Sequence, residues 1–169
     1  MIRVATPADA ETIARVHVAT WRVAYAGLID NAFLAGLSVP ANAVRWAGLL
    51  ADRERRVWIT VDGTGFLAAG AARDDDLPPR TGEVYAAYVL PAAQRQGAGR
   101  ELITAAEHWF AHDRRPGAAL WVLSANVPAQ RFYAACGWAP DGTEREMDIG
   151  GVLVHETRFR RAIPPLGAT

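Results

Sequence analysis

A chain of 169 residues is long enough for one domain with its own hydrophobic core and too short for two. An apolar fraction of 51% and a charged fraction of 21% are ordinary for a globular protein, and a formal net charge of zero argues against a nucleic-acid partner. One cysteine excludes an intrachain disulfide, no apolar run approaches the roughly 18 residues of a membrane span, and the charged N-terminus is unlike a signal peptide, so we expect a cytoplasmic protein without a membrane partner.

The first third of the chain predicts one short strand followed by helices. Residues 2–5 form an apolar strand pattern, and residues 6–9 (TPAD) combine an N-cap hydroxyl, a proline at the first helical position and an acid in the first turn. This helix is expected to run to about Tyr25 and to end at Gly27. A second helical region, interrupted by a proline, is expected over residues 31–50.

The rest of the chain alternates strands and helices without repeats or linkers. Strand, turn and helix signals predict the following order: hairpin 56–61 and 66–73, exposed connection 74–82, strand 83–90, helix 97–112, strand 118–123, helix 126–136, hairpin 144–149 and 152–160. We therefore expect a single mixed α/β domain over residues 1–169, in which residues 163–169 are a flexible tail.

The stretch from Glu83 to Leu102 indicates a binding site for a phosphate-bearing ligand. A strand stops at Pro91 and a loop with Gly97 and Gly99 leads into a helix, whose first amides lack intrahelical partners. Glycines at these two positions leave room for a phosphate to approach the backbone. A nucleotide-binding P-loop is disfavoured because no Lys-Ser/Thr pair follows Gly99, and a dinucleotide fingerprint is weak because its third glycine and its acidic residue are missing.

Two segments resemble the GNAT acetyltransferase superfamily. Residues 94–99 (QRQGAG) match its Q/R-x-x-G-x-G/A loop signature, and residues 126–138 (NVPAQRFYAACGW) resemble its N-x-x-A-x-x-F-Y-x-x-x-G-F/W segment. Both occur in the family's order, separated by a helix and a strand, which is far more specific than either motif alone. The N-terminal helices and the closing hairpin also suit the family, so the resemblance covers essentially the whole chain.

The resemblance implies a fold and a co-substrate. The fold is an α/β (α+β type) GNAT fold: a mixed, mostly antiparallel sheet of about seven strands with helices on both faces, whose parallel fourth and fifth strands splay apart. The co-substrate is acetyl-CoA, with its pantetheine arm in the splay and its pyrophosphate on the loop amides. The cofactor-binding residues implied are Tyr88, Val89, Leu90, Arg95, Gln96, Gly97, Ala98, Gly99, Arg100 and Asn126.

The same resemblance suggests two catalytic side chains. Acylation needs a neutral amine, and an aliphatic ammonium in water has a pKa of roughly 10.4, so a base must take a proton. Glu83 matches a carboxylate that many members place at the start of the fourth strand; the alternative is a strand-edge glutamate facing solvent. Tyr133 matches the family's tyrosine that protonates the leaving thiolate; the alternative is a core tyrosine.

The acceptor site is expected between the first helices and the closing hairpin. Trp21 and Tyr25 lie one helical turn apart and either face this site or pack in the core, and His155 is a further candidate. The acceptor is a small-molecule or peptide amine, and family members often form homodimers. No metal is expected, because His108 and His112 lack the glutamate of HExxH and a third ligand. A non-catalytic acyl-CoA-binding module of the same fold is the alternative function.

Overall fold

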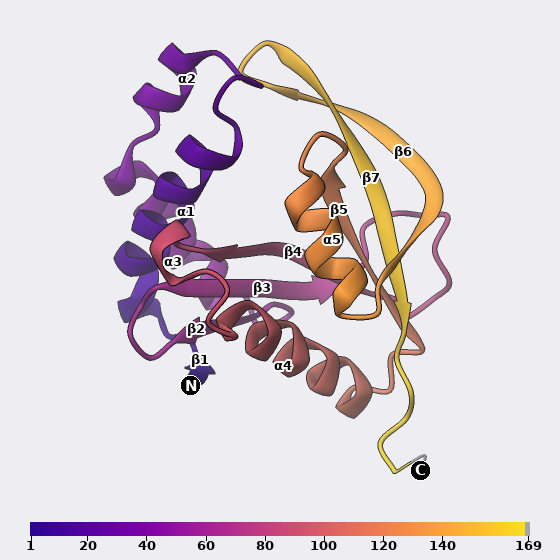
Figure 1. Ribbon diagram of the computed structural model, residues 1–169. Helices are drawn as coiled ribbons and strands as arrows, with labels where there is room; N and C mark the ends of the chain where they lie inside the picture. Colours follow the sequence, from indigo (N-terminus) through magenta and orange to yellow (C-terminus); the bar gives the residue numbers. More distant parts are fainter. Residues whose placement is uncertain (168–169) are drawn as a thin grey trace.

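The computed structural model describes residues 1–167, in which one mixed sheet carries helices on both faces (Figure 1). The strands are β1 (Ile2–Val4), β2 (Arg56–Thr60), β3 (Gly65–Ala71), β4 (Gly82–Val89), β5 (Gly117–Leu123), β6 (Ala139–Ile149) and β7 (Val152–Ala162). They are arranged in the order β1-β2-β3-β4-β5-β7-β6, and every neighbouring pair is antiparallel except β4 with β5. The predicted mixed sheet is confirmed.

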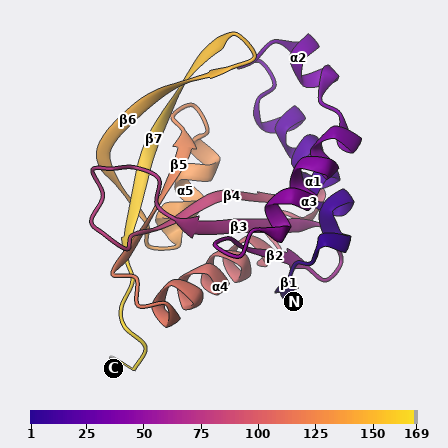
Figure 2. The same ribbon diagram turned by 180° about the vertical axis from the view of Figure 1, so that it is seen from behind.

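Five α-helices of the described chain cover the sheet. They are α1 (Ala10–Ala24), α2 (Asn31–Gly36), α3 (Val39–Ala51), α4 (Ala98–His112) and α5 (Val127–Ala135), with short 3₁₀ turns at Pro7–Asp9 and Pro91–Ala93. Side chains of α1 and α3 pack with those of β2 and β3 in one apolar cluster, whereas α4 and α5 contribute to another. The view from behind in Figure 2 likewise shows α4 separated from α1 and α3 by the strands.

The parallel pair β4 and β5 is joined over only a short stretch. Its register covers Gly82 to Val84 on β4 and Ala118 to Leu120 on β5. Beyond these residues β4 continues to Val89 along β3 alone, with a register shift where Ala68 and Ala69 face it, and β5 continues along β7. The splay that the resemblance implied is therefore present, and it begins after Val84.

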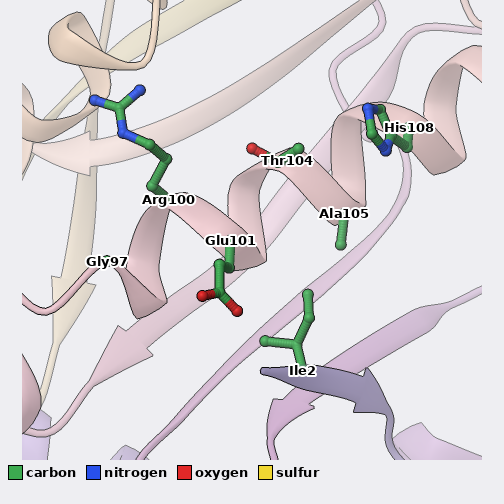
Figure 3. Close-up of a pocket in the computed structure, with 7 residues that line it drawn as sticks. All are labelled: Ile2, Gly97, Arg100, Glu101, Thr104, Ala105 and His108. Atoms are coloured by element: carbon green, nitrogen blue, oxygen red, sulfur yellow. The ribbon is translucent and has the colours of Figure 1, made fainter.

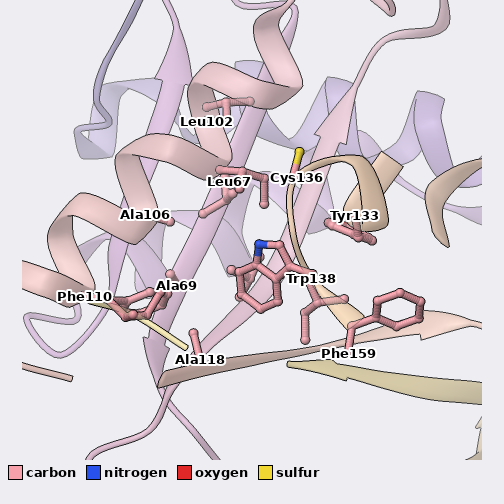
Figure 4. Packing of buried hydrophobic residues seen from close by; sticks show 14 of the residues in the cluster. Leu67, Ala69, Leu102, Ala106, Phe110, Ala118, Tyr133, Cys136, Trp138 and Phe159 are labelled. Atoms are coloured by element: carbon pink, nitrogen blue, oxygen red, sulfur yellow. The ribbon is translucent and has the colours of Figure 1, made fainter. Parts of the chain in front are cut away.

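The α4–α5 cluster fixes one side of the splay (Figure 4). Helix α4 buries one apolar stripe, in which Leu102, Ile103, Ala106 and Phe110 are all at most 2% exposed. Trp138, which ends the second motif, is 2% exposed and donates its indole N–H to Glu107 of α4 at 2.9 Å. Burial of such large apolar side chains stabilises a fold by roughly 1.5–3 kcal/mol each, so α4 and α5 are held firmly against the sheet.

The β6–β7 hairpin reaches α2 and closes the other side of the molecule (Figure 1). At its turn, Gly150 has a positive φ of 62°, and a Cβ there would come within 2.5 Å of the Phe33 ring. Ile149 and Val154 of the hairpin are buried with Leu34 of α2. The hairpin and the first helices thus form two facing walls, as the resemblance implied.

Three details differ from the sequence expectations. The acidic connection is not simply solvated, because Asp74 and Asp76 both bind the guanidinium of Arg158, which is 3% exposed. Strand β6 starts at Ala139 rather than near Glu144. Of the expected tail, Ile163 is 5% exposed in the α4–α5 cluster, and residues 168–169 lie outside the described part of the chain.

Candidate functional site

Main-chain groups of β4 face the gap where β4 and β5 part. Leu90 donates its N–H to the carbonyl of Thr64, on the β3 side, at 2.8 Å. Successive residues of an antiparallel strand direct their main-chain groups to opposite sides, so the N–H of Val89 points toward β5. The carbonyl of Val89 accepts from the side-chain amide of Gln94 at 3.1 Å. The Val89 N–H therefore lies at the gap.

The loop that follows β4 presents a series of unpaired amides. From Arg95 to Arg100 no backbone N–H finds an acceptor within residues 1–167; the first helical bond of α4 runs from Glu101 to Gly97 at 3.0 Å. Arg95 and Gly97 have positive φ values of 62° and 93°. Alternating backbone conformations of this kind gather N–H groups around a concavity that suits an anion, and the helix dipole adds to this attraction.

The two glycines of the loop motif serve different purposes. At Gly97 a Cβ would meet nothing within 4 Å, so the residue is required for its left-handed backbone and leaves the amides open. At Gly99 a Cβ would come within 3.1 Å of the Phe132 ring. Gly99 therefore permits α4 to pack closely against α5, and its expected role in leaving room for a phosphate stays a prediction.

The side chains of the loop mostly brace it. The Gln96 side-chain amide donates to the carbonyl of Ala92 at 3.1 Å, and Arg100 donates to the carbonyl of Ala135, at the end of α5, at 3.1 Å. Arg95 is exposed, and its guanidinium has no partner within the described chain. Arg100 thus has a structural contact of its own, whereas Arg95 remains open to an anion.

Asn126 begins α5 as expected. Its side-chain oxygen accepts the N–H of Ala129 at 3.1 Å, which is an N-cap bond. Its side-chain nitrogen has no hydrogen-bond partner among residues 1–167. Gln130 of the same helix donates to the carbonyls of Leu123 and Ser124, and this fixes α5 to the end of β5.

Tyr133 of α5 has a buried ring and a hydroxyl without a partner. The residue is 9% exposed, and its hydroxyl makes no hydrogen bond within the described chain. The hydroxyl oxygen is nevertheless not completely buried. Burial, followed by the neighbouring Tyr88 hydroxyl and Cys136 thiol, raises the pKa of Tyr133 above its ordinary value. The phenol is therefore protonated throughout the neutral range and free to donate a proton.

An aromatic chain connects β4 with α1 and α3. The Trp21 indole donates to the Tyr88 hydroxyl at 2.9 Å and stacks on Tyr25 at a centroid distance of 4.6 Å. His17 stacks on the Tyr88 ring at 5.4 Å and accepts the indole N–H of Trp46 at Nδ1, at 3.0 Å. Burial, then the charge of nearby Arg45, lowers the pKa of His17 to about 4. The predicted pair Trp21 and Tyr25 therefore lies beside the predicted Tyr88.

A cavity of about 340 Å³ lies between the first helices and the β6–β7 turn. Its lining includes His17, Trp21 and Phe33 from α1 and α2, Arg45 from α3, and Met147 from β6. Such a volume is at the small end of the range for small-molecule sites, roughly 300–1,000 Å³. Tyr25, one turn beyond Trp21, is 8% exposed and packs with Ile149 and Val154 instead of lining this cavity.

Glu83 lies in the joined part of β4 rather than at a solvent-facing edge. It is 1% exposed, and its carboxylate accepts the backbone N–H of Arg73 at 2.9 Å and the Arg73 Nε at 3.2 Å. The Arg73 guanidinium in turn lies 4.6 Å from the centre of the Tyr85 ring. The solvent-facing alternative for Glu83 is thus excluded, and the carboxylate is held by one arginine.

His155 and Glu156 lie on opposite faces of β7. The His155 imidazole is 63% exposed beside Glu146, at 3.9 Å, and does not line the cavity. Glu156 is 7% exposed, faces the side where Val154 packs, and binds Arg145 at 2.7 Å. Its charge contributes, after burial, to the raised pKa of Tyr88, which is about 12. Glu156 is the functional candidate that the sequence did not reveal.

A second depression, of about 500 Å³, runs along the outer side of α4 (Figure 3). It starts at Gly97 and continues past Thr104 to His108, with Ile2 of β1 opposite. In the part of the chain that is described, no group of three or more potential metal ligands occurs, and no helix is long and apolar enough to cross a membrane.

Comparison with known sequences identifies similar proteins. The acetyltransferase (GNAT) family profile matches residues 25–138. An uncharacterized N-acetyltransferase of Bacillus subtilis is 30% identical over 160 residues, which cover 92% of this chain and 88% of the relative. An uncharacterized N-acetyltransferase of Archaeoglobus fulgidus is 31% identical over 137 residues, covering 79% of this chain and 89% of the relative.

Solved structures share the fold at lower identity. The PaiA N-acetyltransferase of Thermoplasma acidophilum, in complex with coenzyme A, has a TM-score of 0.70 at 18% identity, covering 92% of this chain and 96% of that one. YncA of Salmonella typhimurium, solved with acetyl-CoA, has a TM-score of 0.69 at 20% identity, covering 100% of this chain and 96% of that one. The splayed sheet is thus a fold that binds coenzyme A in other proteins.

Proposed function

Because this chain belongs to the GNAT family of acetyltransferases, we propose that it transfers the acetyl group of acetyl-CoA to the amine of a small-molecule or peptide acceptor. The transfer is direct, with both substrates bound at once. The observation that supports this best is the separation of β4 from β5 after Val84, between a loop of unpaired amides and the Tyr133 hydroxyl.

The loop holds the diphosphate of the co-substrate. Amides from Arg95 to Arg100 have no acceptor within the described chain, and a negatively charged group gains both their hydrogen bonds and the field of the α4 N-terminus. Arg95 adds a free positive charge. The depression that starts at Gly97 offers space for the part of the molecule beyond the diphosphate, and the Val89 N–H and the Asn126 amide nitrogen are donors along the gap.

The chemistry requires two proton transfers. The acceptor nitrogen attacks the thioester carbonyl, the new C–N bond forms, the C–S bond breaks, and the amine loses a proton. The Val89 N–H lies where it can stabilise the negative charge that develops on the carbonyl oxygen. Tyr133 donates its proton to the departing thiolate, whose parent pKa is roughly 8.5.

Glu83 is the proposed base, relaying the proton through a chain of water molecules, because Arg73 binds its carboxylate directly and six strand residues, roughly 20 Å, separate it from Val89. Glu83→Gln is expected to lower kcat at least about tenfold while leaving coenzyme A affinity unchanged. Glu156→Gln is the matched comparison, because Glu156 is also buried and also bound to an arginine. A loss of rate in the Glu156 variant alone would transfer the role to Glu156.

The function is tested by two measurements on the whole protein. Calorimetric titration should show that coenzyme A binds and that NAD and ATP do not. Thiol release from acetyl-CoA, followed over a library of amines, should then rise with at least one acceptor. Tight binding of coenzyme A without turnover of any amine would favour a non-catalytic acyl-CoA-binding module, and failure to bind coenzyme A would refute the proposal as a whole.

A further inference from the structure

The charge of the cavity between the first helices and the β6–β7 turn is informative about the acceptor. Arg45 lines it and, within residues 1–167, has neither an ion-pair nor a hydrogen-bond partner for its guanidinium. From this we infer that the acceptor carries a carboxylate beside its amine, and that Arg45 binds this carboxylate. The inference rests on the proposed function and specifies its substrate class.

No other polar group of the cavity pairs with Arg45 within the described chain. His17, with a pKa of about 4, is uncharged at neutral pH. Asp148 also lines the cavity and carries the opposite formal charge, but its carboxylate accepts the N–H of Gly151 at 2.9 Å and forms no ion pair with Arg45 within residues 1–167. Arg45 lies close enough to His17 that its charge contributes, after burial, to the lowered pKa of His17. An anionic group on the acceptor would supply the missing partner.

The acidic residues of β6 do not take the place of this partner. Glu144 and Glu146 are exposed, and Glu146 lies beside the exposed His155. Met147 and Ile149, which alternate with them along the strand, belong to the inner cluster. Glu144 and Glu146 therefore face outward, and a purely cationic amine attracted by these two residues would not be brought to the cavity.

The walls determine the remainder of the acceptor. Trp21, Phe33, Leu37 and Met147 give the cavity apolar and aromatic sides, and a volume of about 340 Å³ suits a small molecule. An amine, a carboxylate and an apolar group on one small molecule describe an α-amino acid with an apolar side chain. The guanidinium is the group that recognises carboxylates most specifically, because its planar fork can donate two parallel hydrogen bonds.

Matched pairs of acceptors test the inference. L-phenylalanine with phenylethylamine, and L-leucine with isoamylamine, differ only by the carboxylate. Initial rates of thiol release from acetyl-CoA should give a kcat/KM that is about tenfold to a hundredfold higher for the amino acid in the better pair. Arg45→Gln should abolish this preference by raising KM for the amino acid, with little change for the plain amine, and Arg45→Lys should keep part of it.

Arg53→Gln is the control, because Arg53 is exposed just beyond α3, has no partner within the described chain, and does not line the cavity. Equal rates for both members of each pair, turnover of plain amines only, or an unchanged preference in Arg45→Gln would overturn the inference and leave the proposed function intact. If coenzyme A binds but no acceptor turns over, L-phenylalanine is titrated calorimetrically into the coenzyme A complex. If the Arg45→Gln substitution weakens the binding of L-phenylalanine at least tenfold, the inference is supported. If L-phenylalanine binds equally well to the variant, or does not bind at all, the inference is overturned.

Discussion

The loop at the start of α4 and the cavity between the first helices and the β6–β7 turn are built from different chemical groups. The loop offers main-chain amides between Arg95 and Arg100, and it requires a residue without a side chain at position 97. The cavity offers side chains from three helices and a hairpin, including His17 and Arg45. A backbone site suits a ligand part that is the same in every reaction, whereas a side-chain site can be changed residue by residue. The predictions below test this division, from the largest expected effect to the smallest.

The largest effect is expected for Gly97→Glu. The new side chain would place bulk and negative charge at the amides, and we expect coenzyme A affinity to fall about a thousandfold, or about 4 kcal/mol. Calorimetric titration measures this. Gly142→Glu is a matched control, because Gly142 also has a positive φ, of 87°, and open space around its Cβ position. Both variants carry a similar backbone strain, of roughly 1–2 kcal/mol, so equal losses of affinity would contradict the loop assignment.

The second effect concerns the cavity wall and its response to pH. Burial holds the pKa of His17 at about 4 in the folded protein, against 6.5 for an exposed histidine. Between these values the unfolded chain binds more protons, so the free energy of unfolding should fall as the pH decreases from about 7 to 4.5, by up to about 3 kcal/mol. Urea unfolding at several pH values measures the decrease.

The variant His17→Gln isolates this contribution, since glutamine retains an acceptor for the Trp46 indole but does not titrate. Its stability should change less between pH 7 and 4.5 than that of the parent protein. The lowered pKa of Asp9, held by Arg3, changes the stability in the same direction but at lower pH: its stabilisation is present above about pH 3.8 and is lost only below that value. An identical pH dependence in the His17 variant would show that another group is responsible.

Tyr133→Phe should reduce kcat about a hundredfold, as expected when a general acid is removed, with little change in coenzyme A affinity. The raised pKa of Tyr133 means that its proton is present at neutral pH, so the loss should persist across the neutral range. Tyr85→Phe is the control, because Tyr85 lies on β4 and its hydroxyl already donates to the Ala71 carbonyl. An unchanged rate in the Tyr133 variant would remove this residue from the mechanism.

The sequence predicted the loop well because its signals are local. Proline at 91, glycine at 97 and the apolar stripe of α4 each act within one turn or strand, and the structure has Gly97 as N-cap with Leu102 buried. The close packing of Gly99 against Phe132 was not predicted, because Phe132 lies far along the chain. Local signals cannot report such contacts between distant segments.

The cavity was harder to predict for the same reason. The side of β7 that faces inward is set by its pairing with β5, where Leu123 lies opposite Glu156, and a shift of one residue exchanges Glu156 with His155. Neighbouring polar residues on β7 give no clear alternation of polar and apolar positions. The sequence therefore did not show that Glu156 rather than the predicted His155 faces inward. Arg158 likewise pairs with Asp74 and Asp76, which lie more than eighty positions earlier in the sequence.

The smallest effect, and the sharpest test of the division, is expected for Trp21→Phe. This change removes the indole N–H that donates to Tyr88 and keeps an aromatic ring against Tyr25. A lost hydrogen bond of this kind costs about 1 kcal/mol, so KM for the acceptor should rise about fivefold. Trp109→Phe on α4 is the control, because Trp109 packs on Trp58 and donates no side-chain hydrogen bond within the described chain. If the two sites are built independently, coenzyme A affinity is unchanged in both variants; a loss of affinity in the Trp21 variant that matches its rise in KM would show that Tyr88 couples them.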